Sequence, residues 1–172
     1  VRSGDEMNIL AAPTVGNADG SAIMYRFDNA RTDHVRTGEA GVRAKLRTGS
    51  IGHTLSATVS SFSQKSRNAY AMSDFFTGFA TNIYRPVDVA APPANFFTGG
   101  DMNNPLLTQK SILSSYAVAD TMELAGGKLL VTVGARQQKI KAYSYDYNTG
   151  AENSAYDEAE VTPVAGIVYK PW

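Results

Sequence analysis

The stretch that decides the fold is Lys128–Asp146, which reads KLLVTVGARQQKIKAYSYD. In its first half, apolar residues fall on one face of an extended chain and more polar residues on the other: Leu129, Val131, Val133 and Ala135 against Thr132, Gly134, Arg136 and Gln138. A period of two predicts a β-strand, because successive side chains of a strand point to opposite faces. At roughly 3.3 Å per residue the strand reaches about 60 Å, more than twice the usual length in a soluble domain.

The residues before this stretch predict its hairpin partner. A turn at Gly126 and Gly127 sets the register, and apolar positions then coincide on one face: Leu124 with Leu129, Met122 with Val131, Val118 with Ala135, and Tyr116 beside Gln137. The same register places Asp120 opposite Val133 on the apolar face. We therefore expect a β-bulge or a shift of register near Asp120.

A second hairpin is predicted around Thr48–Gly52. Apolar residues alternate on both sides of this turn: Ala40, Val42, Ala44 and Leu46 before it, and Leu55, Ala57 and Val59 after it. Pairing Leu46 with Leu55 places both sets on one face. The opposite face of these strands is polar: Glu39, Arg43, Lys45, Thr54, Ser56, Thr58, Thr132, Arg136 and Gln138. So many charges do not suit the dry core of a β-sandwich.

Composition narrows the classes of protein. The 16 basic and 16 acidic residues cancel, so the chain lacks the basic patch expected of a nucleic-acid partner. The absence of cysteine excludes disulfides and thiolate metal sites. With two histidines, no Gly-x-Ser-x-Gly elbow and no phosphate loop, we expect neither an enzyme nor a metal site. No apolar run approaches the roughly 18 residues of a membrane helix, which leaves a soluble β protein or a membrane β-barrel.

Taken in order, the chain predicts an all-β antiparallel meander of about five long strands, at 35–48, 52–70, 109–125, 128–147 and 159–170. Residues 1–34 read as an extracellular loop segment with one or two short strands, and residues 71–108 as a long extracellular loop. Short and long connections alternate, so the short turns gather at one end, as in outer-membrane barrels. Five strands are too few to close such a barrel, so we expect a section of a larger one.

Several blocks resemble the TonB-dependent siderophore receptors: GEAGVRAKLRTGSIGHTL (38–55), NIYRPV (82–87), LSSYAVADTMEL (113–124), LLVTVGARQQKI (129–140) and YNTGAENSAYDEAEVTPVAGIVYKP (147–171). The resemblance covers about residues 35–172. It implies a section of a 22-stranded transmembrane β-barrel in the bacterial outer membrane, lacking the plug. It further implies a receptor that binds and imports ferric siderophores with energy from the TonB complex, contacted through a plug domain absent here. Iron would enter only with the ligand, and no cofactor is expected.

The loop at 71–108 is rich in aromatic residues: Phe75, Phe76, Phe79, Tyr84, Phe96 and Phe97. Aromatic walls with a few polar groups suit the organic shell of a siderophore. We therefore expect five residues to bind the ligand: Tyr84, Arg85, Phe96, Phe97 and Arg136. The alternative is that the aromatic residues only pack the loop against its neighbours.

Other readings stay open at this point. Lys139 and Lys141 would face lipopolysaccharide phosphates above the apolar band, or only solvent. Asp146, Asn148 and Gly150 have the spacing that begins a calcium loop, but the later acidic ligands are missing and a turn fits better. Two other functions also remain: a soluble β-sandwich that binds a ligand or carbohydrate through the loop aromatics, and a general porin or adhesin barrel.

Overall fold

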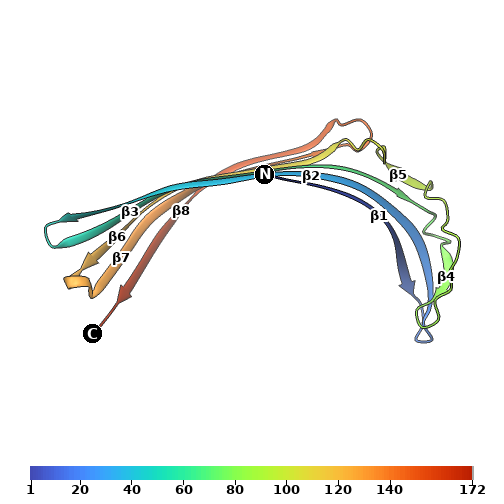
Figure 1. The fold of residues 1–172 in the computed structure, drawn as a ribbon, viewed down its shortest axis with the longest axis horizontal. Coiled ribbons are helices and arrows are strands. Elements are labelled where there is room, and N and C mark those ends of the chain that lie inside the picture. Colours follow the sequence, from blue (N-terminus) through green and yellow to red (C-terminus); the bar gives the residue numbers. More distant parts are fainter. Residues whose placement is uncertain (172) are drawn as a thin grey trace.

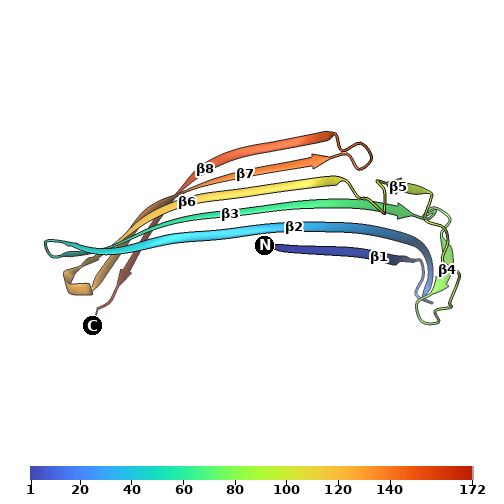
Figure 2. The ribbon, with the colours of Figure 1, turned by 45° about the horizontal axis from the view of Figure 1, so that its top comes forward.

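The backbone of residues 1–171 forms one curved antiparallel sheet. A computed structural model describes these residues, and their side chains except those of 8–13. Six long strands lie side by side in the order β1–β2–β3–β6–β7–β8 (Figure 1, Figure 2). Two short strands extend the sheet, because β4 pairs with β2 and β5 pairs with β3. The sheet is bent into an arch and does not close on itself (Figure 1).

The long strands are β1 (Arg2–Val15), β2 (Ser21–Thr48), β3 (Ile51–Met72), β6 (Leu107–Leu124), β7 (Leu129–Tyr145) and β8 (Glu152–Tyr169). The short strands are β4 (Phe79–Asn82) and β5 (Phe97–Gly99). A single 3-10 turn, η1 (Ala125–Gly127), joins β6 to β7. Among residues 1–171, no helix is both long enough and apolar enough to cross a membrane.

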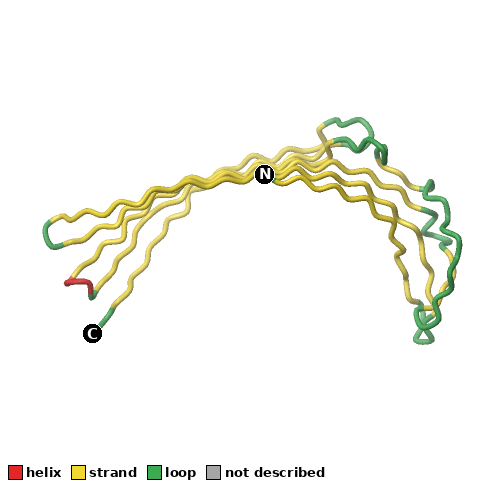
Figure 3. Tube along the Cα trace, viewed as in Figure 1, coloured by secondary structure: helices red, strands yellow, loops and turns green. Residues whose placement is uncertain are grey.

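The two ends of the sheet carry different connections. At the end that we call the turn end, Gly49–Ser50 joins β2 to β3 and η1 joins β6 to β7. Gly49 and Gly126 have φ angles of 62° and 66°, which glycine adopts without strain. The opposite end, the loop end, holds the segment 73–106 and the loop 146–151 (Figure 3). The five-residue turn 16–20 also lies there, so one short connection departs from the predicted asymmetry.

The strand register fixes two faces. We call a row the set of side chains that the register places next to one another across β2, β3, β6, β7 and β8. One such row consists of Val42, Ala57, Val118, Ala135 and Pro163, and the face that carries it is the apolar face. The opposite, polar face carries the neighbouring row Arg43, Ser56, Ala119, Gly134 and Val164. The predicted polar residues all fall on the polar face by this alternation.

The predicted register of β6 with β7 is confirmed. The structure pairs Leu124 with Leu129, Met122 with Val131, Val118 with Ala135 and Tyr116 with Gln137. It also pairs Asp120 with Val133, and no bulge interrupts the ladder at that point. The expected bulge or shift is therefore wrong. Asp120 stays on the apolar face because its Oδ2 has a partner there, the Nδ1 of His53 at 2.7 Å.

The predicted register of β2 with β3 is wrong by two residues. Leu46 lies opposite His53, and Ala44 lies opposite Leu55. The cause is the turn, which contains only Gly49 and Ser50 and is tighter than the expected turn at 48–52. A shift of two residues leaves every side chain on its predicted face, because the side-chain period of a strand is also two.

Two predicted boundaries need larger corrections. Residues 1–34 do not form a loop: β1 pairs along its whole length with the first half of β2, from Arg2 opposite Val35 to Val15 opposite Ala22. The last strand begins at Glu152 rather than at 159. Both segments lie toward the loop end, beyond the apolar rows, where neither face shows the hydrophobic alternation on which the prediction depends. The count of about five strands was therefore too low, and the predicted loop at 71–108 contains β4 and β5.

Few side chains are buried, as expected of a single layer. The buried apolar residues are small ones near the loop end: Ala22, Ala30, Ala69 and Ala71. Within residues 1–171 the strands belong to one sheet, with no second sheet to form a sandwich core. The β-sandwich alternative therefore receives no support from the described residues. Because neither face is covered by another layer, each must be judged by what it would contact in a larger protein.

Candidate functional site

Aromatic side chains gather on the polar face near the loop end. Tyr25 and Phe27 of β2 and Tyr70 of β3 share this face with Asp33 and Ser66 by alternation along the strands. The loops add further rings next to them. We call the whole set the aromatic wall: Tyr25, Phe27, Tyr70, Phe75, Phe76, Phe96, Phe97 and Tyr147.

Tyr70 is the centre of one half of the aromatic wall. Its ring is stacked with Phe27 at 6.4 Å and with Phe97 at 6.3 Å between centroids. Tyr147 meets it edge-on at 5.2 Å, which brings in the loop 146–151. The backbone of Gly99 passes so close that a Cβ there would lie 2.4 Å from Tyr70 Cε1. Tyr70 therefore ties β2, β5 and the β7–β8 loop together.

Phe75 is the centre of the other half. Its ring centroid lies 4.4 Å from that of Phe76, 6.0 Å from that of Phe96 and 6.2 Å from that of Tyr25. Phe76 and Phe96 remain 77% and 51% exposed. This half therefore keeps apolar surface free for a further contact, whereas a loop stabilised only by its own packing would cover it.

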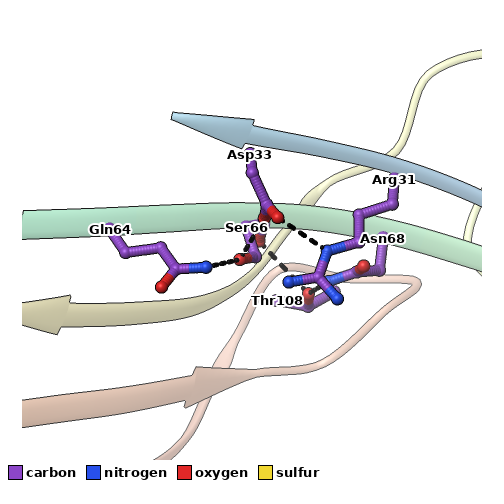
Figure 4. A network of polar contacts seen from close by, with 6 residues as sticks. All are labelled: Arg31, Asp33, Gln64, Ser66, Asn68 and Thr108. Carbon is purple, nitrogen blue, oxygen red and sulfur yellow. Dashed lines mark hydrogen bonds and ion pairs between the residues drawn. The ribbon is translucent and has the colours of Figure 1, made fainter. Parts of the chain in front are cut away.

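Figure 4 shows a network of polar contacts. It lies on the polar face next to the aromatic wall, because Asn68 is the neighbour of Tyr70 on that face of β3. Asp33 accepts hydrogen bonds from Arg31 Nε at 2.9 Å and from Ser66 Oγ at 2.5 Å. Thr108 donates to the backbone oxygen of Ser66 at 3.2 Å and accepts from Asn68. Ser66 and Thr108 are buried, while the side chain of Arg31 is 40% exposed. The network thus holds a cationic group at the surface beside the aromatic rings.

Arg136 lies further from the loop end, in a hollow of about 350 Å³. Polar groups line part of this hollow, among them Glu39, Ser60 and Gln138. The next row of the polar face toward the loop end is apolar and consists of Phe62, Leu113 and Ile140. The polar face is therefore less uniformly polar than predicted, and the hollow combines charge with apolar surface.

The structure separates the five predicted ligand residues into three places. Phe96 and Phe97 belong to the aromatic wall. Tyr84 and Arg85 lie near the turn 16–20, where the ring of Tyr84 covers Gly20 and a Cβ on that glycine would lie 2.4 Å from Tyr84 Cδ2. Arg136 lies in the separate hollow. Their role in ligand binding stays a prediction.

Four members of the aromatic wall were not predicted from the sequence: Tyr25, Phe27, Tyr70 and Tyr147. Arg31 was not predicted either. Extending the alternation of the strands beyond their apolar residues would have placed Tyr25, Phe27 and Tyr70 on the polar face. Tyr147 gave no such signal, because it lies in the loop after β7 and its contact depends on the three-dimensional arrangement.

The loop at Asp146 forms a turn. Asp146 Oδ1 accepts hydrogen bonds from the backbone N–H groups of Asn148 at 2.9 Å and Thr149 at 2.8 Å, and from the Thr149 hydroxyl. These donors, the Thr149 N–H first, lower the pKa of Asp146 below its usual value. Within residues 1–171, no three His, Asp or Glu side chains gather where they could bind a metal. The Asp146 carboxylate thus acts as a cap for the turn.

Basic residues lie on the apolar side of the sheet beyond the apolar rows. Lys139 and Lys141 each pair with Asp157, at 3.0 Å and 2.9 Å. A hollow of about 330 Å³ lies on neighbouring strands and is lined by His34, Arg36, Ser63, Lys65, Arg67 and Leu107. The charge of Lys139 and Lys141 is therefore partly neutralised within the sheet, and the second group is the more basic surface.

These features define a class of protein. One antiparallel sheet has an apolar face on one side, a polar face on the other, tight turns at one end and the longest loops at the other. Such a sheet is the wall of a membrane β-barrel, in which lipid covers the apolar face and the polar face lines the interior. The chain belongs to the TonB dependent receptor-like β-barrel family, whose model matches residues 9–172.

Known relatives agree with this assignment. The chain is 29% identical over 170 residues to the ferrichrome receptor FcuA of Yersinia enterocolitica, in a match that covers 98% of this chain and 22% of the relative. The crystal structure of BauA, the ferric preacinetobactin receptor from Acinetobacter baumannii, matches with a TM-score of 0.72 and 23% identity over 99% of this chain. This chain covers 24% of BauA, so it spans less than a quarter of either relative.

The comparisons confirm the predicted resemblance to TonB-dependent receptors. The family is one of receptors and not a class of enzymes. The likeness to BauA shows that the open sheet has the fold of part of such a barrel. Neither the porin nor the adhesin alternative receives support from these matches.

Proposed function

We propose that the chain is part of the wall of an outer-membrane receptor that binds ferric siderophores and imports them with energy from the TonB complex. The observation that carries the proposal is that this sheet, which belongs to a receptor family, has one apolar and one polar face. Its loop end also bears the aromatic wall. The turn end would face the periplasm and the loop end the outside of the cell, because outer-membrane barrels have short periplasmic turns. The apolar face would contact lipid.

The aromatic wall and Arg31 suit the entrance for the ligand. The organic shell of a siderophore offers apolar surface to rings, and its oxygen atoms offer acceptors to a guanidinium group. Tyr84 and Arg85 would act at the outer rim of the same vestibule, and Arg136 deeper inside. Contact with the TonB complex would fall to a plug domain, which is not among the residues that the structure describes.

Lipopolysaccharide is a second proposed partner of this wall. The basic hollow of His34, Arg36, Lys65 and Arg67 lies beyond the apolar rows toward the loop end, so it would be level with the outer leaflet in the proposed orientation. Cationic side chains at that level attract lipid phosphates. We favour this group over Lys139 and Lys141, because Asp157 already neutralises part of their charge.

The test compares variants of the complete receptor that contains this chain. In one variant Phe76 and Phe96 are replaced by serine, and in another Tyr84, Arg85 and Arg136 are replaced by alanine. Each is expected to weaken ferric-siderophore binding by about tenfold or more, since each removes ring or guanidinium contacts. The matched control is Lys139→Ala, which removes a cation from the other face. Binding is measured by quenching of intrinsic fluorescence.

The two variants separate the parts of the proposal. Unchanged affinity in the triple variant would remove Tyr84, Arg85 and Arg136 from the site. Unchanged affinity in both variants, together with correct folding in the outer membrane, would contradict the role of this wall in ligand capture. A receptor that stayed in the soluble fraction would contradict the membrane location itself.

A further inference from the structure

Two polar residues interrupt the apolar face. His53 of β3 and Asp120 of β6 lie in neighbouring rows, with Leu46 and Met122 beside His53 and with Leu55 and Val133 beside Asp120. His53 Nδ1 is 2.7 Å from Asp120 Oδ2. An ionised carboxylate only accepts hydrogen bonds, so the proton of this bond is on Nδ1. The side chains are 17% and 23% exposed, so both reach the surface of the apolar face.

The Asp120 carboxylate is incompletely satisfied. Its Oδ1 is buried and has no hydrogen-bond partner among residues 1–171. Within the same described residues, His53 is the one cationic-capable group in an ion pair with Asp120. A carboxylate with a single partner is costly on a face that contacts lipid. Oδ1 itself is closed to a ligand, but the exposed part of the side chain presents the negative charge of the carboxylate, which favours a ligand with positive charge and N–H donors.

An apolar hollow of about 530 Å³ begins at Asp120. It is lined by Ala44, Leu55 and Val133 of the row of Asp120, together with Val42, Ala57 and Val118 of the next row away from the turns, and the small residues among them leave space between the larger ones. His53 lies one row nearer to the turn end. The polar groups thus stand at the turn end of the hollow, and the hollow runs toward the middle of the apolar face.

The depth of the pair fits the edge of a bilayer. Ile51 and Leu124 mark the last paired row at the turn end. His53 and Asp120 lie two and four residues from that row, about 7 and 13 Å along the strands at roughly 3.3 Å per residue. A strand tilt of about 40° makes the vertical depths about 5 and 10 Å. With that last row placed at the water surface of the headgroup layer, which is roughly 5 to 7 Å thick, these depths span the boundary between headgroups and hydrocarbon in the periplasmic leaflet.

We propose that His53 and Asp120 bind the primary ammonium group of one phosphatidylethanolamine molecule of the periplasmic leaflet, with one of its acyl chains in the apolar hollow. The inference rests on the proposed location of the sheet in the outer membrane. A primary ammonium has three N–H donors and a positive charge. Asp120 supplies a carboxylate acceptor, and His53 in its neutral form supplies the lone pair of Nε2, since Nδ1 carries the proton.

The proposal predicts different binding for three lipid headgroups: phosphatidylethanolamine, phosphatidylcholine and phosphatidylglycerol. Phosphatidylcholine has a positive charge but no N–H donor, and phosphatidylglycerol has no positive charge. The complete receptor is purified in detergent and given each of the three lipids with identical acyl chains. Native mass spectrometry then counts the lipid molecules that stay bound. We expect one phosphatidylethanolamine molecule to be retained about tenfold better than either other lipid, as one charged hydrogen-bonded contact provides.

Substitutions at the pair and in the hollow test whether the retained lipid is bound at this site. Asp120→Asn keeps the shape of the side chain and removes its charge, so it is expected to abolish the preference for phosphatidylethanolamine. Ala57→Phe fills the hollow and leaves the polar pair intact, so it is expected to lower retention of the bound lipid. Gln137→Leu is the matched control, because it removes a polar group two rows beyond Asp120 on the same face, outside the residues that line the hollow, and is expected to change nothing.

Three outcomes would overturn the proposal. The first is equal retention of the three lipids by the wild-type receptor. The second is an unchanged preference in both Asp120→Asn and Ala57→Phe. The third is a receptor dimer that Asp120→Asn dissociates, since the pair would then contact a second copy. Ferric-siderophore binding is measured in parallel and is expected to be unchanged in every variant, so failure of the lipid site is distinguishable from failure of the proposed function.

Discussion

Val42 tests the assignment of the apolar face at a single residue. Its side chain is 73% exposed, and its row neighbour on β3 is Ala57. Val42→Arg near mid-membrane is expected to cost roughly 2 to 4 kcal/mol of folding free energy. The measurement is urea unfolding of the complete receptor in lipid vesicles. Val133 is less suitable for this test, because an arginine there could pair with Asp120 directly opposite.

The control for Val42→Arg is an arginine on the other face. Gln138 lies on the polar face opposite Glu160 of β8, which would accept the added charge. Gln138→Arg is therefore expected to change the unfolding free energy little. Equal costs for both variants would show that the two faces do not differ in environment, and the membrane orientation of the sheet would have to be abandoned.

Gly134 tests how closely β6 and β7 approach each other. A Cβ at this position would lie 2.6 Å from the carbonyl oxygen of Val118 and 2.8 Å from the Cβ of Ala119. Because backbone cannot move aside as a flexible side chain can, Gly134→Ala is expected to cost roughly 1 to 3 kcal/mol. Gly166→Ala is the matched control on the same face, since nothing lies within 4 Å of its Cβ position. Thermal unfolding of the receptor measures both, and similar melting temperatures would contradict the close approach.

At the scale of single residues, the sequence predicted the face of the sheet on which a side chain lies better than it predicted the residue with which that side chain interacts. The alternation of Leu129, Val131 and Val133 was sufficient to place them, because hydrophobic side chains repeat with the period of the strand. The pairing of Asp120 with Val133 is confirmed, but the bulge or register shift expected there is wrong. A carboxylate on an apolar face breaks the hydrophobic pattern, which is why the shift was expected. The pairing with His53 explains why the carboxylate is tolerated, but it crosses from β6 to β3, two strands whose mutual register was not predicted.

The loop 146–151 is an element whose order is expected to depend on pH. Hydrogen bonds from the Thr149 N–H and its neighbours lower the pKa of Asp146 in the folded loop. A carboxyl group with a depressed folded pKa stabilises the fold above its unfolded pKa of about 3.9, and this stabilisation is lost as the pH falls through the lower folded value. We therefore expect the turn to loosen below about pH 4.

Amide chemical shifts of Asn148 and Thr149 in the labelled receptor measure this change. In the wild type they are expected to move together as the pH falls from about 6 to about 2. Asp146→Asn is the control, because an amide oxygen still accepts hydrogen bonds but does not titrate in this range. Movement of equal size in Asp146→Asn would show that another group controls the loop.

Thr108 tests whether the polar network holds the start of β6 in place. The side chain is buried, donates to the Ser66 backbone and accepts from Asn68, beside the register shift between Ser66 and Arg67. Thr108→Val keeps the shape but leaves those partners unsatisfied, which is expected to cost roughly 1 to 3 kcal/mol. Hydrogen exchange is expected to rise locally at the start of β6. Thr98→Val on the exposed strand β5 is the control, and equal exchange in the two variants would contradict this role.

At the scale of elements, hydrophobic alternation revealed strands only where one face is apolar. The pairs of β6 with β7 were predictable for this reason. The halves of β2 and β8 near the loop end have polar or mixed side chains on both faces, so they read as loop although their backbones are paired in the sheet, with one irregularity where β8 pairs with the end of β7. The aromatic wall was predictable in part, since Phe96 and Phe97 stand in one aromatic run. Tyr70, the centre of one half, lies two residues before the end of β3 and gave no signal of its contacts with Phe27 and Tyr147.

The whole molecule is an open sheet whose two edges lack partners among the described residues. β1 pairs only with β2, and β8 pairs only with β7. Free strand edges template pairing with other chains, and an exposed apolar face adds association in water. The isolated chain is therefore expected to aggregate in detergent-free buffer. In detergent micelles the apolar face is covered but the edges are not, so small oligomers are expected in place of aggregates.

Lysine substitutions distinguish the edges from the apolar face. Val161→Lys with Ile167→Lys places charge along the edge strand β8, whereas Val42→Lys with Val118→Lys adds the same charge to the inner strands β2 and β6. In micelles, light scattering is expected to show smaller oligomers for the edge variant only, because lysine on an edge opposes strand pairing. Equal reduction by both variants would show that the oligomers form through the apolar face. A detergent-free monomer of the unmodified chain would contradict its place in a membrane wall, since its edges and apolar face would then need no neighbours.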